Sequence, residues 1–228
     1  MHYYSYSEPK GTEPNQDSYS IQQNDSTIIL TIADGVGGLP NAAYASQYSI
    51  QTFLQIAKET KTTDLPSIIK KVNQQLTQEI NIKKQQMATT LLACLIDIKT
   101  KNVNISHVGD TRAYIINKTI WKTKDHTLVQ DLVDLGILTD DQAHHHPERN
   151  RLKQALGITT DITITQETKN LQGSILFLCS DGLHDYVSDN EIITTIRQKP
   201  LRSICTLLTK KARENNSKDD ITSIVFQL

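Results

Sequence analysis

The sequence predicts an α+β fold, a four-layer α-β-β-α sandwich in which two antiparallel β-sheets pack together and helices flank them on both sides. Three observations predict it. Strand-like runs open the chain, two helical segments follow them, and more strand-like runs come next. Successive strands are joined by short polar connections, as antiparallel neighbours are. One last helix and one last strand close the chain, which is not the regular strand-helix alternation of a parallel sheet.

The first third of the chain contains a predicted hairpin and two predicted helices. Residues 18–34 hold two short strand-like runs with Asn24 and Asp25 as turn residues between them, which favours a β-hairpin. Apolar side chains then recur at helical spacing within residues 41–59 and again within residues 65–80. This spacing predicts two consecutive helices, each with one apolar face.

Strand-like runs return after these helices. They cover residues 90–97, 103–108 and 112–116, and the polar stretches DIKTKN and GDT separate them. We expect the three strands to form a meander, because such short connections join antiparallel neighbours. The following residues, about 125–155, are polar and helical and are predicted to form an insertion over one edge.

The last third is predicted to return to strands before a final helix. Strand-like runs occupy residues 162–166 and 175–179. Apolar residues at helical spacing between Leu201 and Ala212 predict a helix. The closing ITSIVFQL is a further strand-like run. We expect residues 1–228 to form a single domain, since 37% hydrophobic residues in this length can bury one large core.

Composition excludes several classes of protein. The 24 Lys and Arg residues balance 25 Asp and Glu residues, so no basic field indicates a nucleic-acid partner. No run approaches the ~20 apolar residues that a membrane helix needs, and the N-terminus lacks the pattern of a signal peptide. Three scattered cysteines without a CxxC pair argue against disulfides or structural zinc. We therefore expect a soluble, cytoplasmic protein with no nucleic-acid or membrane partner. We also expect it to be a monomer.

Aspartates recur at the points where predicted strands begin or end. One such residue on its own is an ordinary turn residue. Because a carboxylate beside a buried strand has a desolvation cost, the repetition is explained if these strand ends converge on a cation. The five positions are Asp17, Asp34, Asp110, Asp181 and the pair Asp219–Asp220.

A site rich in aspartate but poor in histidine and cysteine favours a hard divalent cation. Mg²⁺ and Mn²⁺ take oxygen ligands in octahedral geometry, whereas zinc prefers nitrogen and sulfur. The glycines that follow Asp34 fit this hypothesis, because a backbone without Cβ atoms can approach a metal and its ligand closely. They are Gly35, Gly37 and Gly38.

Eight short motifs in this chain resemble those of one enzyme family in order and in separation. They are NQDSY, IADGVGG, ATT, HVGDTRAY, DHTLVQDLVDLG, HPERNRLKQALG, LCSDGLHDYV and DDIT, and they span residues from about 15 to 226. In these motifs the sequence resembles the bacterial metal-dependent serine/threonine phosphatases of the protein phosphatase 2C family. Each motif alone is weak, but eight in order are specific. The α-β-β-α sandwich of that family agrees with the fold predicted above.

The resemblance implies a site with two metal ions, Mn²⁺ or Mg²⁺. By similarity, Asp34 bridges both ions and Gly35 offers its backbone carbonyl. The remaining ligands implied for the two ions are Asp17, Asp181 and Asp219. A third, weaker ion is implied at Asp110 together with Asp181. Residues 125–151, which include His126, resemble the mobile flap that influences substrate choice in this family.

The implied reaction is hydrolysis of phosphoserine and phosphothreonine. Two divalent ions lower the pKa of a bridging water, which attacks phosphorus directly, so no cysteine or serine nucleophile is needed. Asp17, Asp34 and Asp181 are the catalytic residues in this sense, because they act through the activated water. The partners implied are phosphorylated proteins, the substrates of a bacterial serine/threonine kinase.

Several positions depart from the family pattern, and two of them change the charge at the predicted site. Thr12 stands where many members carry an arginine that binds the substrate phosphate, and Lys10 is the nearby residue that could supply a positive charge instead. A lysine cannot reproduce the bidentate grip of a guanidinium group, so weaker phosphate binding is expected. Asp220 stands where the family usually has asparagine, which adds negative charge beside Asp219.

Three other features have a structural interpretation. Cys179 ends an apolar run and is predicted to be a core residue. The adjacent residues His144–His146 point in different directions on a helix, which favours a solvated surface over one metal site. Arg112 and Tyr114 alternate along a strand and are left outside the predicted site.

Two other functions stay open at the level of the sequence. The chain could be a weak or inactive relative that binds and regulates a phosphoprotein, an interpretation that Thr12 favours. Four mutually repelling carboxylates argue against it, because a binding module does not need them. The second alternative is a phosphatase that serves one regulatory partner and hydrolyses almost no phosphopeptide.

Overall fold

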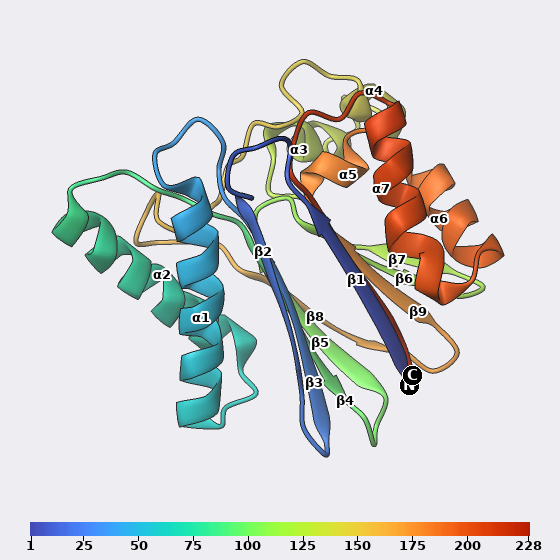
Figure 1. Cartoon of the computed structure of the whole chain (residues 1–228), viewed down its shortest axis with the longest axis horizontal. Coiled ribbons are helices and arrows are strands. Elements are labelled where there is room, and N and C mark those ends of the chain that lie inside the picture. The colour runs from blue at the N-terminus through green and yellow to red at the C-terminus, as the bar shows by residue number, and fades with distance from the viewer.

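The computed structural model describes residues 1–228 and contains two five-stranded antiparallel sheets that pack face to face (Figure 1). The first sheet has the strand order β1 (His2–Glu8), β10 (Ile221–Gln227), β9 (Ile175–Cys179), β6 (Arg112–Ile116) and β7 (Ile120–Lys122). The second has the order β2 (Asp17–Gln23), β3 (Thr27–Asp34), β4 (Leu91–Asp97), β5 (Asn102–Val108) and β8 (Thr165–Asn170).

Helices cover the outer face of each sheet, so the predicted four-layer sandwich is confirmed (Figure 1). The second sheet is covered by α1 (Ala42–Thr60) and α2 (Leu65–Lys83). The first sheet is covered by α6 (Asp189–Gln198) and α7 (Ile204–Glu214), with the short α5 (Asp181–His184) and a 3-10 turn at Leu201–Ser203 beside them. Residues 125–151, hereafter the flap, contain α3 (Leu128–Asp134) and α4 (Asp140–His144).

Strand β4 shows why the layers pack in this way. Every second residue of a strand points to the same face, and both faces of β4 are apolar. One face packs between the two sheets, with Leu92, Cys94 and Ile96. The other packs against α1 and α2, with Leu91, Ala93 and Leu95. Full burial of one such aliphatic side chain contributes about 1.5–3 kcal/mol, so this strand anchors two of the three apolar layers.

The predicted meander of residues 90–97, 103–108 and 112–116 is wrong in its last strand. β4 pairs with β5 as expected, but β6 lies in the other sheet and pairs with β9 and β7. The chain changes sheets at Gly109, whose φ of +105° and whose close approach to Thr90 both require glycine. The GDT connection is therefore a crossing between sheets, and it leaves Asp110 at the end of the sandwich.

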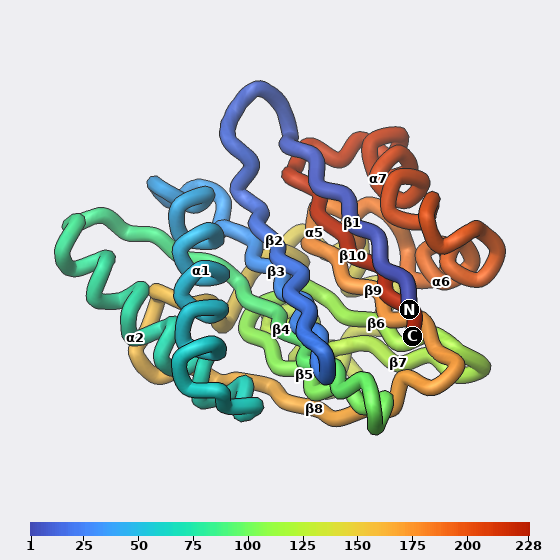
Figure 2. The backbone as a smooth tube through the Cα atoms, turned by 60° about the horizontal axis from the view of Figure 1, so that its bottom comes forward, coloured from blue at the N-terminus to red at the C-terminus, as the bar shows by residue number.

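Other boundaries differ less from the predictions. The strand expected at 162–166 begins only at Thr165, because Ile162 turns inward to the apolar layer beneath α1 and α2. Strands β1 and β7 and helices α5 and α6 were not predicted. β1 pairs with β10 along its full length, which places the two chain termini side by side (Figure 2).

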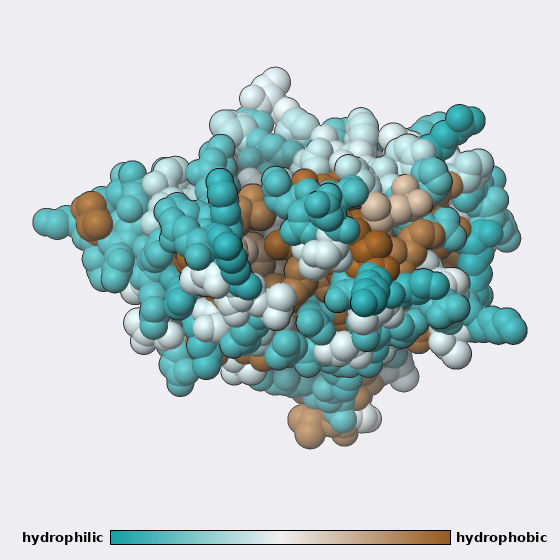
Figure 3. All heavy atoms as spheres, turned by 90° about the horizontal axis from the view of Figure 1, so that it is seen from below, coloured by the Kyte–Doolittle hydropathy of each residue, from teal (hydrophilic) through white to brown (hydrophobic).

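The turn of the β2–β3 hairpin and the open end of the same hairpin lie at opposite ends of the sandwich. At the lower end, where the β2–β3 hairpin turns, the surface is largely polar with apolar side chains gathered along its middle (Figure 3). The register of the hairpin places Asp17 opposite Asp34 at the other end. None of the helices has the length and apolar content to cross a membrane.

Candidate metal centre

Asp17 and Asp34 meet because they occupy the open end of one hairpin. Asp17 begins β2, Asp34 ends β3, and the antiparallel register makes the two residues direct cross-strand partners. Like charges directly opposite each other on a sheet are destabilising. The hairpin therefore positions two carboxylates where the folded chain alone does not favour them.

Asp17 is buried and incompletely satisfied. Its side chain is 5% exposed, its Oδ2 accepts a hydrogen bond from Ser180 Oγ at 2.7 Å, and its Oδ1 has no partner in the chain. Burial raises the pKa of Asp17 to about 7. The nearby carboxylates of Asp220 and Asp219 also raise this pKa, whereas the hydrogen bond from Ser180 lowers it. An unpartnered buried carboxylate oxygen is the atom that a cation would satisfy.

The backbone fixes Asp34 and Gly35 tightly. The Asp34 carbonyl accepts bonds from Thr90 N and Thr89 Oγ1, both at 2.8 Å, and the Asp34 amide donates to Thr90 Oγ1 at 2.9 Å. A Cβ on Gly35 would lie 2.3 Å from the Ala42 carbonyl oxygen, so glycine is required there. The Gly35 carbonyl accepts no hydrogen bond, which leaves it free to bind a ligand.

Asp110 and Asp181 reach the same end of the sandwich from two further elements. Asp181 follows β9 at the start of α5, and Asp110 follows β5 and is 5% exposed. Burial raises the pKa of Asp181 to about 7, with Asp185 and Asp219 adding to it. Burial also raises the pKa values of Asp34 and Asp110 well above the usual range, and in both residues the Asp181 charge is the next cause.

The structure therefore brings together the side chains of aspartates that are far apart in the sequence. These are Asp17, Asp34, Asp110, Asp181 and Asp219, hereafter the carboxylate group. Asp219 completes the group from the segment before β10, and its side chain is 47% exposed. No three Asp, Glu, His or Cys side chains form a ready-made metal site. Mg²⁺ binds through one or two carboxylates and keeps several waters, so all-oxygen donors that raise one another's pKa fit such an ion.

The two predicted substrate residues have different surroundings. Lys10 reaches the rim of the group, because its Nζ lies 3.8 Å from Asp219 Oδ1 and donates to Gln16 Oε1 at 3.0 Å. Thr12 is exposed in the same loop and makes no side-chain hydrogen bond. Only Lys10 is thus in contact with the carboxylate group.

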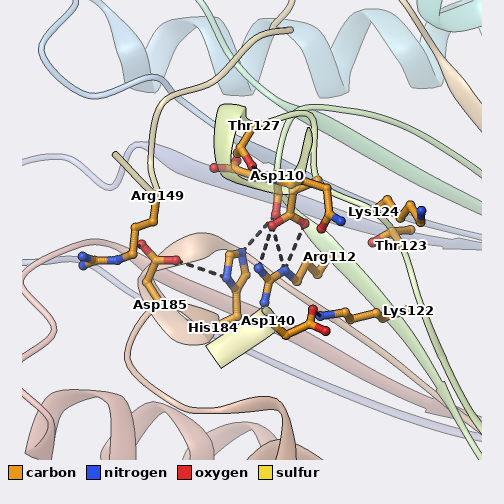
Figure 4. A network of polar contacts seen from close by, with 12 residues as sticks. Asp110, Arg112, Lys122, Thr123, Lys124, Thr127, Asp140, Arg149, His184 and Asp185 are labelled. Carbon is orange, nitrogen blue, oxygen red and sulfur yellow. Dashed lines mark hydrogen bonds and ion pairs between the residues drawn. The ribbon is translucent and has the colours of Figure 1, made fainter. Parts of the chain in front are cut away.

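A groove of about 950 Å³ begins at Asp110 and runs beneath the flap. His184 links its two walls, since Nε2 donates to the Asp110 carbonyl at 3.0 Å and Nδ1 lies 3.4 Å from Asp185 Oδ1 (Figure 4). Arg149 of the flap donates to Asp185 Oδ2 at 3.1 Å. The flap is therefore anchored beside the carboxylate group by an ion pair.

Several residues around this groove were not predicted as part of the site. His184 and Asp185 lie within the LCSDGLHDYV motif and Arg149 within HPERNRLKQALG, so the motifs themselves were the available signal. Arg112 was left out on structural grounds, and it forms a bidentate pair with Asp125 at 2.6–3.0 Å in the groove wall. Cys179 is fully buried, as predicted.

His126 lies at the base of the flap and holds it to the core. Its backbone amide donates to the Gly109 carbonyl at 3.0 Å, and its Nδ1 accepts from the Gly109 amide at 3.3 Å. Its other ring nitrogen bonds Thr165 Oγ1 at 2.8 Å. Burial and the stacked ring of His107 lower the pKa of His126 to about 4, so the ring is neutral at pH 7.

Comparison with known proteins adds independent findings. A family profile described as "Protein phosphatase 2C" matches residues 6–224. A serine/threonine phosphatase of Listeria welshimeri is 30% identical over 93% of this chain and 90% of its own length. The crystal structure of the serine/threonine phosphatase Stp1 from Staphylococcus aureus is similar, with a TM-score of 0.89 and 29% identity over 100% of this chain and 95% of that one. The catalytic domain of the phosphatase PstP, solved in complex with two manganese ions, has a TM-score of 0.79 and 28% identity over 98% of this chain and 96% of that one.

Proposed function

Because this chain belongs to the protein phosphatase 2C family and is a protein serine/threonine phosphatase, we propose that its carboxylate group binds two divalent cations, Mn²⁺ or Mg²⁺. The proposed ligands are the side chains of Asp17, Asp34, Asp181 and Asp219 and the carbonyl of Gly35. The observation that carries the proposal is the convergence of these aspartates at one end of the sandwich, with a buried Asp17 oxygen left unpartnered. Asp110 and Asp181 are proposed to hold a third, weaker ion.

Bound divalent ions supply a water of lowered pKa and neutralise the phosphoryl oxygens during in-line displacement. The chain prepares the place for this chemistry. Ser180 holds the Asp17 carboxylate in one orientation, while Thr89 and Thr90 fix the backbone of Asp34. A positioned ligand loses little freedom during the reaction, so these bonds favour turnover. Asp17, Asp34 and Asp181 are catalytic in this sense.

Lys10 is proposed to bind the phosphoryl group of the substrate. Its ammonium lies at the rim of the carboxylate group, where a phosphate would enter. As a point charge it attracts the phosphate without the bidentate geometry of an arginine. Thr12, which is exposed in the same loop, is proposed to lie beside the phosphate but supplies no charge.

The substrates of this phosphatase are phosphorylated proteins, in line with the named relatives. We propose that a bacterial serine/threonine kinase phosphorylates them. The groove beneath the flap is proposed to receive the protein segment around the phosphorylated residue, because it adjoins Asp110. A monomeric state, a single-domain organisation and a cytoplasmic location are proposed on the basis of the sequence.

Hydrolysis of p-nitrophenyl phosphate with and without Mn²⁺ tests the proposal. We expect metal-stimulated turnover that falls at least about 100-fold in D34N and D181N, since each substitution removes a ligand charge while the fold persists. Circular dichroism checks the fold of each variant. Near-native turnover in either variant would refute its assignment as a ligand. A wild-type chain without any metal-stimulated turnover, yet able to bind a phosphoprotein, would support the inactive regulatory alternative.

A further inference from the structure

The loop between β1 and β2, residues 9–16, is held at both ends by one carboxylate. Asp220 Oδ1 accepts the backbone amide of Lys10 at 2.7 Å, and Asp220 Oδ2 accepts the backbone amide of Gln16 at 2.8 Å. Asp220 is only 2% exposed, so these two bonds are made away from water. Bonds from backbone amides to an ionised carboxylate are about twice as strong as neutral ones. Asp220 therefore closes the loop that leads directly into Asp17.

Arg213 reinforces the same closure from α7. Its Nη1 donates to the Asp219 carbonyl at 2.7 Å, and its Nη2 donates to the Pro9 carbonyl at 3.1 Å. Its Nε donates to Glu8 Oε1 at 2.8 Å. The guanidinium thus ties the start of the loop to the segment that carries Asp219. With Asp220, it fixes the loop against the carboxylate group from two sides.

This closure determines where the Lys10 ammonium lies. The backbone of Lys10 is fixed by Asp220, and its Nζ donates to Gln16 Oε1, a residue that Asp220 also fixes. The Gln16 carbonyl in turn accepts the Gly35 amide at 3.0 Å, so the loop is also bonded to the residue after Asp34. Both the base of the lysine side chain and the hydrogen-bond acceptor of its ammonium, Gln16, are therefore positioned by a single residue.

We propose that Asp220 is a positioning residue for substrate binding, which holds the Lys10 ammonium at the entrance of the carboxylate group to meet the phosphoryl oxygens. This inference rests on the phosphate-binding role of Lys10 in the proposed function. It also assigns a role to the second aspartate of the DDIT motif. Each Asp220 oxygen accepts a loop amide, so we assign Asp220 to the loop and leave it outside the proposed set of metal ligands.

The chemistry explains why an aspartate suits this position. A carboxylate offers two acceptor oxygens to two donors. An asparagine would offer one oxygen and one NH₂ group, and that NH₂ would face the amide of either Lys10 or Gln16. One end of the loop would then lose its bond and leave a buried donor unsatisfied. The lysine would be released from its fixed position while its charge stayed intact.

A double-mutant cycle between Asp220 and Lys10 tests this inference, with p-nitrophenyl phosphate as the probe at saturating Mn²⁺. We expect K10Q to raise KM about tenfold and D220N to raise it by a similar factor, with kcat within about twofold of wild type. In the K10Q background, D220N should raise KM no further, because Asp220 acts through the lysine. The Mn²⁺ concentration for half-maximal activity is measured for each variant, so that every KM is taken with the metal site filled.

The matched control is D97N. Asp97 Oδ1 also accepts a backbone amide, that of Thr100 at 2.7 Å, but Asp97 is the last residue of β4, next to the turn that leads to β5. This variant should leave KM unchanged. If D220N does not fold, R213K takes its place in the cycle, because lysine keeps the charge but loses the simultaneous bonds to Pro9 and Asp219.

The outcomes separate the two claims. If K10Q leaves KM unchanged, the phosphate-binding role of Lys10 is wrong, and the inference fails with that part of the proposed function. If K10Q raises KM but D220N raises it equally in both backgrounds, Asp220 acts only on general structure and the positioning role is refuted. An unchanged KM in folded D220N refutes it as well.

Discussion

Replacing Gly35 with alanine should destabilise the fold and disturb the carboxylate group at once. The new Cβ would lie 2.3 Å from the Ala42 carbonyl oxygen and 2.5 Å from the Ala42 carbonyl carbon. Ordinary contacts need about 3.5 Å, so the start of α1 must move by roughly 1 Å. Overpacking of this kind costs about 1–3 kcal/mol, and because the neighbour is backbone we expect about 3 kcal/mol. For a chain of this length the loss lowers Tm by roughly 6–12 °C.

Urea unfolding of G35A and G37A in EDTA measures this cost. Gly37 is the matched control, since a Cβ there meets no atom within 4 Å. G37A should therefore unfold within about 0.5 kcal/mol of wild type, as surface substitutions do. G35A should also lose turnover on p-nitrophenyl phosphate, because a shift at this position displaces Asp34 and the Gly35 carbonyl. Equal stability of G35A and G37A would refute this reasoning.

Two further predictions concern metal and pH. Mn²⁺ at 100 times its Kd should stabilise the folded chain by about 2.7 kcal/mol, because only the folded state assembles the aspartates. Differential scanning fluorimetry should then show a Tm roughly 5–10 °C higher that EDTA reverses, and an unchanged Tm would contradict converging ligands. For His126, the folded pKa of about 4 lies below the value of about 6.5 in the unfolded chain. The free energy of unfolding therefore falls as the pH falls from about 6.5 to about 4. In urea unfolding, the free energy of H126Q should depend less on pH in this window. A dependence identical to that of wild type would contradict the role of burial.

Periodicity predicted most elements because most of them bury one or two regular faces. The strand at residues 175–179 and the helix beginning at 65 match β9 and the start of α2. The errors arose where tertiary pairing decides. β6 has the same local pattern in either sheet, and only the turn at Gly109 sends it to β9. β1 was missed although tyrosine favours strands, because its pairing with the distant β10 is not visible in the sequence.

Candidate site residues could be predicted from the sequence where they lie at the ends of predicted strands. Asp34 and Asp181 each follow an apolar run and Asp17 begins a strand-like run, and the structure brings all three together. Residues that act through contacts distant in sequence were not predictable. The sequence left Asp220 as an extra charge of uncertain effect, whereas its bonds to Lys10 and Gln16 span more than 200 residues and appear only in three dimensions.

Anomalous diffraction at the manganese edge, from crystals grown with Mn²⁺, tests the central claim most directly. We predict two manganese peaks at the end of the sandwich, both within bonding distance of oxygens from the proposed aspartates, with Asp34 shared between them. Manganese bound elsewhere, with Asp17, Asp34 and Asp181 making no contact with either ion, would contradict the account.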